Sequence, residues 1–291
     1  MKNRRFRERL LLSLLVVGLT AAVGNPQHRR TRYIMTPPLV KAAMDGHLAA
    51  VRQLLQEGRP VDEPTSEGQT ALMAAAEAGQ YEVVQLLLGH GAAVNARDRH
   101  QVTALLAAAG RGYREIVRLL LEHDANLDVP DDEGWTPLLS ATLHGHPEVA
   151  VLLVDRGADV NCRDRQGSTP LIAAADGGRE QLVTLFLEKG ADVETRFKDG
   201  RTALMMAAAQ GHPVIVEKLL TAGANIDATD RDGWTALLFT VVNKQTEVLK
   251  LLIEHGADVH RADKDGLTPL RLACIRHFDD IAAILTAHGA K

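Results

Sequence analysis

Histidine and cysteine are the residue types in this sequence best suited to metal binding or nucleophilic chemistry. The 291-residue chain contains 12 histidines and two cysteines, Cys162 and Cys274. His100, His144 and His146 are the histidines of most interest for a metal site. No cysteine or carboxylate near them completes a recognised metal-ligand spacing. We therefore expect neither a metal site nor a cofactor.

Short motifs of common enzyme families are also missing. The chain has no H-E-x-x-H, no G-x-S-x-G, no phosphate-binding P-loop and no dinucleotide fingerprint. We expect no catalytic residues, and no small-molecule substrate is evident. Acidic residues outnumber basic ones, 37 to 33, and aromatic residues make up only 3%. Both values disfavour a nucleic-acid binder, which needs positive charge and rings that stack on bases.

The N-terminal segment has the pattern of an export signal. Residues 2–9 carry five basic side chains and one acidic side chain, and Leu10 to Val23 form an apolar run. A basic stretch, an apolar run and small residues before a cleavage point predict a secretory signal peptide over residues 1–24. An uncleaved signal anchor is an alternative, as is an amphipathic first helix, although the run is apolar all round. Residues 25–36 are interpreted as a basic linker.

A threonine recurs at intervals of 33 residues and opens the same kind of segment each time. The segments, which include TALMAAA, TPLIAAA and TALMMAA, begin at Thr70, Thr103, Thr136, Thr169, Thr202, Thr235 and Thr268. A degenerate copy, PPLVKAA, begins at Pro37, which gives eight units. A fixed period of this length predicts stacked units rather than separate globular domains.

Each unit can be divided into two helices and a turn. Threonine is a favourable N-cap, and proline is tolerated at the first helical position. A glycine nine residues after the threonine is expected to end the first helix. The second helix ends near a Gly-Ala pair, and Asp and Gly then suit a projecting turn.

Most histidines fit this repeat and need no further role. His90, His123, His255 and His288 are expected in the last turn of a second helix, where positive charge suits the helix dipole. His47, His146 and His212 follow the mid-repeat glycine.

Residues 37–291 resemble the ankyrin-repeat family. The family motifs D-x-x-G-x-T-P-L, A-A-x-x-G-H and L-L-x-x-G-A-D-V-N recur in phase, for example as DRQGSTPL from Asp164 and GADVN from Gly157. The resemblance implies an all-α repeat solenoid of about eight 33-residue units, each a helix-turn-helix with a β-hairpin finger. It also implies a concave face, with terminal caps at about residues 37–69 and 268–291.

The sequence departs from the family pattern at several positions. Gln101, Asp124, Lys244 and His277 stand where the repeats otherwise have glycine, and we expect local irregularities there. The histidine that the family places after T-P-L is absent throughout, and we expect more apolar packing in its place.

The two cysteines should remain unpaired. Cys274 takes a family alanine position and is expected to be buried, whereas Cys162 opens a unit about three repeats, or roughly 30 Å, away. A disulfide needs Cα atoms within about 7 Å of each other, so we expect two free thiols.

The resemblance places the candidate partner-binding residues at the fingertips, before the repeat threonine and at the ends of the first helices. The fingertip candidates are Arg99, His100, Glu133, Arg165, Arg231 and Asp232. Trp135, Arg201 and Trp234 precede a repeat threonine, and Arg111, His144 and Asn243 end first helices. A solvated rim also explains the charges, and packing against a neighbouring finger also explains the tryptophans. Trp is enriched in binding hot spots, and the two Trp residues share one register.

Two functions follow from these observations. The first is a non-catalytic interaction scaffold, exported to the cell envelope, that binds a protein or peptide as a chaperone-like or inhibitor (immunity-type) protein. The second is an enzyme or metal-dependent stress-protection protein that uses concave-face histidines. We favour the first and expect a monomer in a bacterial periplasm, with secretion or an inner-membrane anchor as alternatives. Contact with a membrane is expected only if the N-terminal segment is not cleaved.

Overall fold

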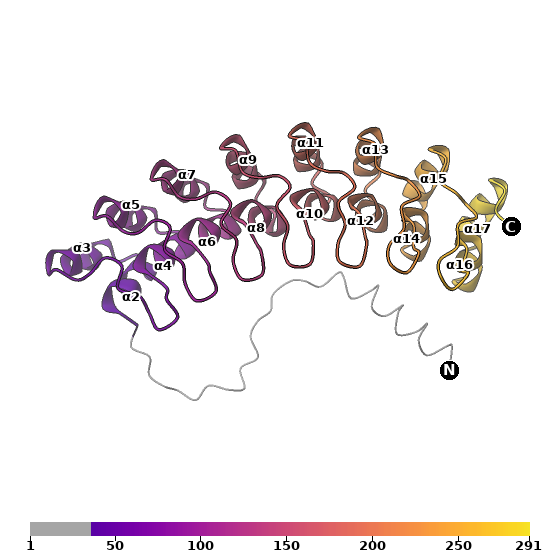
Figure 1. Ribbon diagram of the computed structural model, residues 1–291. Coiled ribbons are helices and arrows are strands. Elements are labelled where there is room, and N and C mark those ends of the chain that lie inside the picture. Colours follow the sequence, from indigo (N-terminus) through magenta and orange to yellow (C-terminus); the bar gives the residue numbers. More distant parts are fainter. Residues whose placement is uncertain (1–35) are drawn as a thin grey trace, which may run out of the picture. The chain divides into compact units, whose positions relative to one another are not determined.

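Sixteen α-helices, arranged as eight consecutive pairs, account for the regular structure of residues 36–291, the part of the chain that the computed structural model describes (Figure 1). The first helices of the pairs are α2 (Pro38–Met44), α4 (Ala71–Ala78), α6 (Ala104–Arg111), α8 (Pro137–His144), α10 (Pro170–Asp176), α12 (Ala203–Gln210), α14 (Ala236–Val242) and α16 (Pro269–Ile275). The second helices are α3 (Leu48–Gln56), α5 (Tyr81–Gly89), α7 (Arg114–Glu122), α9 (Pro147–Asp155), α11 (Glu180–Glu188), α13 (Pro213–Thr221), α15 (Thr246–Glu254) and α17 (Asp279–Ala287). The predicted signal peptide and residues 25–35 of the predicted linker lie outside the described residues.

The repeat threonine starts the first helix of each pair from α4 onward. Its hydroxyl oxygen accepts a hydrogen bond from the backbone N–H three residues later, as Thr103 does from Leu106 at 3.1 Å. The same bond forms at Thr70, Thr136, Thr169, Thr202, Thr235 and Thr268. This bond satisfies one of the N–H groups left free at a helix N-terminus, and it confirms the predicted cap.

Small aliphatic side chains fill the interior of the stack. In α12 every residue from Ala203 to Ala208 is buried, and each first helix packs on the first helices of its neighbours. Phe186 is the largest of the fully buried side chains. Since thin layers of helices pack against each other, alanine, leucine and valine suffice for the core, and few aromatic residues are needed.

Side chains in the turn between the paired helices also connect successive repeats. His146 Nε2 lies 3.1 Å from the carbonyl oxygen of Gly110, and His212 Nε2 lies 3.3 Å from that of Asp176, 36 residues back in each case. Gln80, Arg179 and Gln245 donate to carbonyls at the same spacing. These contacts satisfy carbonyl groups that end a first helix, and they give His146 and His212 a structural role.

The histidines at the ends of second helices are C-cap residues. Nδ1 of His90, His255 and His288 lies 2.8–2.9 Å from the carbonyl oxygen four residues earlier. His123 is the C-cap of α7. The predicted location near the helix C-terminus is therefore confirmed for all four.

Projecting turns connect one helix pair to the next, and we call them fingers. Taken by itself, the unit of residues 36–291 is a curved stack with the second helices on its outer side and the fingers on its inner side (Figure 1). The all-α repeat solenoid is confirmed, with eight repeats. The predicted β-hairpins are instead tight turns, since residues 36–291 contain no β-strand.

The four departures from glycine coincide with unusual backbone. Gln101, Asp124, Lys244 and His277 are the non-glycine residues with positive φ among those described, at 64°, 62°, 56° and 58°. Equivalent positions in other repeats hold glycine at similar angles, such as Gly134 at 86°. The backbone geometry of the repeat is kept at these four places, at the cost of left-handed conformation in L-residues.

One prediction about the core was wrong. Cys274 is exposed, whereas its counterparts Ala208 and Val241 are buried. The following repeat covers that face of the helix at Ala208 and Val241, whereas within residues 36–291 no further helix pair packs on the corresponding face of α16. Both Cys162 and Cys274 are free thiols.

Candidate functional site

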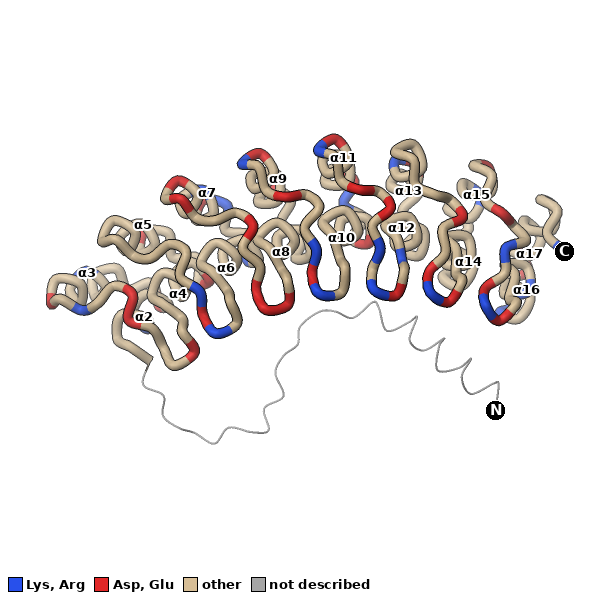
Figure 2. Tube along the Cα trace, viewed as in Figure 1, with Lys and Arg blue, Asp and Glu red and all other residues tan. Residues whose placement is uncertain are grey.

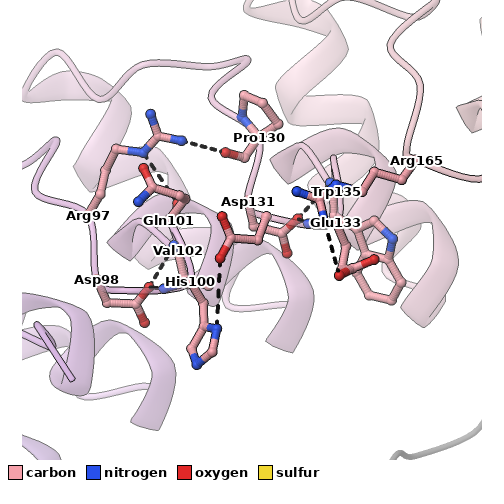
Figure 3. Close-up of polar contacts among 11 residues, drawn as sticks. Arg97, Asp98, His100, Gln101, Val102, Pro130, Asp131, Glu133, Trp135 and Arg165 are labelled. Atoms are coloured by element: carbon pink, nitrogen blue, oxygen red, sulfur yellow. Dashed lines mark hydrogen bonds and ion pairs between the residues drawn. The ribbon is translucent and has the colours of Figure 1, made fainter.

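An aspartate closes most of the fingers. The Oδ1 atom of Asp131 accepts hydrogen bonds from the backbone N–H groups of Glu133, at 2.9 Å, and Trp135, at 2.8 Å (Figure 3). Asp98, Asp164, Asp230 and Asp263 make the same pair of bonds in their own fingers. Such local side-chain bonds favour a turn over regular secondary structure, so the position of the fingertip is fixed.

Backbone hydrogen bonds also join each finger to the next. The N–H of Arg165 donates to the carbonyl of Glu133 at 2.8 Å, and the N–H of Arg231 donates to that of Asp199 at 2.8 Å. Four equivalent bonds extend the ladder, with donors at Arg99, Asp132, Lys198 and Lys264. Each finger is therefore supported by its neighbours, and the tips form a continuous, pre-ordered edge.

The charged fingertip candidates pair between neighbouring fingers. Arg99 lies 3.5 Å from Glu67, and Arg165 lies 3.6 Å from Glu133. His100 Nδ1 lies 3.9 Å from Asp132, and this contact is an ion pair only when the imidazole is protonated (Figure 3). All of these side chains are 45–74% exposed, so each pair contributes about 1 kcal/mol or less to stability.

Figure 2 shows that most fingertips carry both signs of charge, whereas the fingers before α4 and α8 are acidic only. The finger before α8 has more acidic residues at its tip. Its residues are Asp131, Asp132 and Glu133. Asp131 is occupied with closing the turn, so Asp132 and Glu133 present this charge to solvent. The fingertip edge is thus mixed in charge, with two fingers that carry acidic residues only.

The finger before α12 departs from the aspartate pattern. Phe197 stands where five other fingers have the closing aspartate, and the guanidinium carbon of Arg201 lies 5.5 Å from its ring centre. Arg201 Nε also donates to Asp199 Oδ2 at 2.7 Å, and the arginine side chain is only 21% exposed. Arg201 therefore replaces part of the missing turn support. Arg231 and Asp232 in the next finger are exposed, and the Asp232 carbonyl accepts from the N–H of Lys264.

The two tryptophans are half-buried, and each packs on an aromatic residue of the following helix. The Trp135 ring lies 5.8 Å from that of His144 in an edge-to-face arrangement, and the Trp234 ring lies 5.3 Å from that of Phe239. Burial raises the pKa of Asp230, which bonds to the N–H of Trp234, above its usual range. The tryptophans thus have fixed backbones and packed rings, and each residue is partly exposed.

The remaining candidates, Arg111, His144 and Asn243, lie at the C-terminal ends of first helices. His144 Nδ1 lies 2.8 Å from the carbonyl oxygen of Ser140, and the Asn243 amide donates to that of Phe239 at 3.0 Å. Arg111 pairs with Glu77 of the preceding repeat at 3.0 Å. All three residues are exposed, and each side chain is held by a hydrogen bond or an ion pair.

A family model described as ankyrin repeats (3 copies) matches residues 11–98, 97–164, 158–230 and 211–291. The chain belongs to the ankyrin-repeat family. Ankyrin repeats are generally protein–protein interaction modules and are typically non-catalytic. No curated protein matches the chain.

The ankyrin stack brings several of the predicted residues together. Trp135 meets His144, Glu133 meets Arg165, and Trp234 lies against Phe239, whose carbonyl bonds Asn243. Trp135 and Trp234 lie three repeats apart, so no single small ligand contacts both.

Sequence reasoning missed Phe239 and Phe197 as aromatic neighbours of the candidate residues. Phe239 lies five residues after Trp234, on the next helix, and Phe197 interrupts the aspartate series of the fingers. An aligned comparison of the repeats, position by position, would have singled out both.

The described part of the ankyrin stack holds no group of three or more His, Cys, Asp or Glu residues suited to a metal ion. Within the same residues no helix is long and apolar enough to cross a membrane. Cys162 Sγ lies 3.1 Å from the hydroxyl of Thr136, and burial raises the pKa of this thiol to about 12. At neutral pH Cys162 is therefore a protonated, poorly nucleophilic thiol.

Proposed function

We propose that this ankyrin-repeat protein is a non-catalytic scaffold that binds a protein or peptide along its fingers and the adjoining first-helix ends. The observation that carries the proposal is the pair of half-buried tryptophans, Trp135 and Trp234, each fixed against a second aromatic ring. Trp in a well-packed, partly desolvated setting is the residue type that most often dominates binding energy.

The ordered fingers support the same proposal. Because the backbone ladder and the closing aspartates already fix the tips, little conformational entropy is lost when a partner binds. The mixed charges of the tips would then act on the rate and selectivity of association. Fingertip pairs such as Arg165 and Glu133 are too exposed to supply much affinity by themselves.

The spacing of the tryptophans defines the length of partner that could contact both. Three repeats span about 30 Å at usual helix packing distances. An extended segment of roughly nine residues covers that length at about 3.3 Å per residue. The partner is therefore an extended peptide segment, or a protein surface of similar length, with apolar side chains at both ends of the contact.

The cellular setting of the proposal rests on the N-terminal segment. The basic residues 2–9 and the apolar run from Leu10 to Val23 favour export to a bacterial envelope, with the ankyrin repeats in the periplasm as a monomer. The intact mass of the protein from native cells tests this: loss of residues 1–24 is expected, and a full-length mass in the soluble fraction would contradict it.

Partner capture tests the binding surface. The double variant Trp135→Ala/Trp234→Ala should lower recovery of the partner from envelope extracts about tenfold or more, as expected for two hot-spot residues. Val151→Ala/Val214→Ala is the matched control, because both valines are exposed on second helices, at 39% and 43%. Equal recovery by the wild type and the tryptophan double variant would refute the proposed surface.

A captured partner would also separate the two roles of such a scaffold. If the partner is an enzyme that the scaffold stabilises, addition of the ankyrin protein should raise its melting temperature and leave its activity intact. If the partner is a toxin that the scaffold neutralises, addition should abolish its activity at a one-to-one ratio.

A further inference from the structure

An open cavity of about 500 Å³ lies at the turns that join α4 to α5 and α6 to α7. It is separate from the fingers and from both tryptophans. Its lining residues are Gly79, Tyr81, Glu82, Gly112, Tyr113, Arg114, Glu115 and Ile116. Two tyrosines and three charged residues thus line one open hollow.

The side chain of Tyr113 makes no hydrogen bond to the preceding repeat, unlike most side chains at its register. At the same register, His146 and His212 bond to a carbonyl of the preceding repeat. Tyr113 instead lies over Gly79, where an added Cβ would come within 2.7 Å of the ring. Its hydroxyl has no hydrogen-bond partner among residues 36–291, and the residue is 37% exposed. The ring is therefore held in place while its polar end stays available.

The charges around the cavity do not cancel. Arg114 and Glu115 form an ion pair at 2.9 Å, and Glu115 also pairs with Arg118 at 2.7 Å. Arg118 in turn pairs with Glu122 at 2.9 Å, so these two arginines and two glutamates balance each other. These bonds to Arg118 and Arg114 lower the pKa of Glu115, so it stays ionised. Glu82 has no ion-pair partner within the described part of the chain. The uncompensated charge at the cavity is therefore the carboxylate of Glu82.

We propose that this cavity binds a compact organic cation, an alkylammonium or quaternary ammonium group, against the rings of Tyr81 and Tyr113 and beside Glu82. Aromatic faces attract cations, and a carboxylate adds to that attraction. Anions are disfavoured by Glu82. A divalent metal ion is disfavoured because the cavity offers too few free carboxylates for its coordination. Either a free small molecule or a lysine side chain of another protein could supply such a cation.

The test is an NMR titration of the ankyrin protein with choline, followed through the amide signals of α5 and α7. The neutral isostere 3,3-dimethyl-1-butanol has the same shape without the charge. N-acetyl-lysine methylamide represents the side chain of a protein. Saturable shifts with choline and none with the isostere are expected. Tighter binding of the lysine derivative than of choline would identify a lysine side chain of another protein as the natural ligand. Tighter binding of choline would identify a free organic cation.

Two variants and one control make the test specific. Glu82→Gln and Tyr113→His should each weaken choline binding by about threefold or more. Histidine occupies the Tyr113 register at His146 and His212, so the turn is retained. Glu148→Gln, at the Glu82 register of another repeat, should change nothing. The proposal is overturned if choline gives no saturable shifts, if the isostere binds equally well, if both variants bind like the wild type, or if inorganic phosphate binds there instead.

Discussion

The indole of Trp135 and the imidazole of His144 meet edge to face, with ring centres 5.8 Å apart. Trp135 is fixed by the closing aspartate of its finger, and His144 is held by the carbonyl of Ser140 in the adjoining helix. Finger and helix thus share one aromatic contact at the proposed binding surface. This contact is the local basis for treating the two elements as one binding surface.

Replacing Gln101 by glycine should stabilise the protein. Gln101 has a φ of 64°, where a Cβ costs about 1–2 kcal/mol that glycine would not incur. Glycine also raises the conformational entropy of the unfolded chain, which offsets part of this stabilisation. We expect a net gain of about 0.5–1 kcal/mol in the free energy of unfolding by urea. The control Lys250→Gly, inside α15, should cost about 1 kcal/mol. Destabilisation by Gln101→Gly would contradict the backbone assignment.

Loss of a closing aspartate should destabilise its finger. Asp164 accepts hydrogen bonds from the N–H groups of Gln166 and Ser168, both at 2.8 Å. The Asp164→Ala variant leaves both N–H groups without this acceptor. A loss of about 1–3 kcal/mol in unfolding free energy is expected. Asp164→Asn keeps an acceptor oxygen and should recover most of the loss. If the Ala and Asn variants are equally stable, the aspartate does not close the turn.

The two thiols should differ in reactivity. Cys274 is exposed, whereas burial raises the pKa of Cys162 to about 12. At pH 8 a disulfide reagent should therefore modify one thiol of the folded protein quickly and the second only after denaturation. Rapid modification of Cys162, identified by peptide mapping, would contradict its burial.

The same thiol makes stability depend on alkaline pH. The folded state holds the Cys162 proton up to about pH 12, whereas the unfolded thiol releases it above its ordinary value of 9.0. Between these values the folded state binds more protons, so the free energy of unfolding falls as pH rises. The variant Cys162→Ala should show a shallower decline between pH 9 and 11 in urea titrations. Equal slopes for the two proteins would refute the shift.

Fingertip charges should act on association more than on folding. Glu133 and Arg165 are 66% and 61% exposed, so Glu133→Gln should change the unfolding free energy by less than about 0.5 kcal/mol. The same change should alter the rate of partner association and its dependence on salt. A large stability loss with no change in association rate would reverse this assignment of roles.

The sequence was sufficient to predict the stack of helix pairs, although not the form of the fingers, because the helical repeat is local. The threonine cap and the position of the mid-repeat break depend on residue types within one unit, and Gln101, Asp124, Lys244 and His277 could be identified by register alone. The constant 33-residue register then predicted that the units stack, since each unit must match its neighbours to pack against them.

Other features depend on contacts between units and could not be predicted. Cys274 is exposed because no helix pair covers that face of α16 within residues 36–291, although its register predicts burial. The contact between Trp234 and Phe239 depends on how a finger folds back on the next helix. The cavity at Tyr81 and Tyr113 depends on two side chains of adjacent repeats.

Hydrogen exchange of the ankyrin protein with and without its captured partner tests the proposed binding surface most directly. Protection should appear at residues 131–144 and 230–243, which contain the two tryptophans and their aromatic neighbours. Amides of the outer helices α9 and α13 should exchange at unchanged rates. Protection confined to the outer helices, with none at Trp135 or Trp234, would contradict the account.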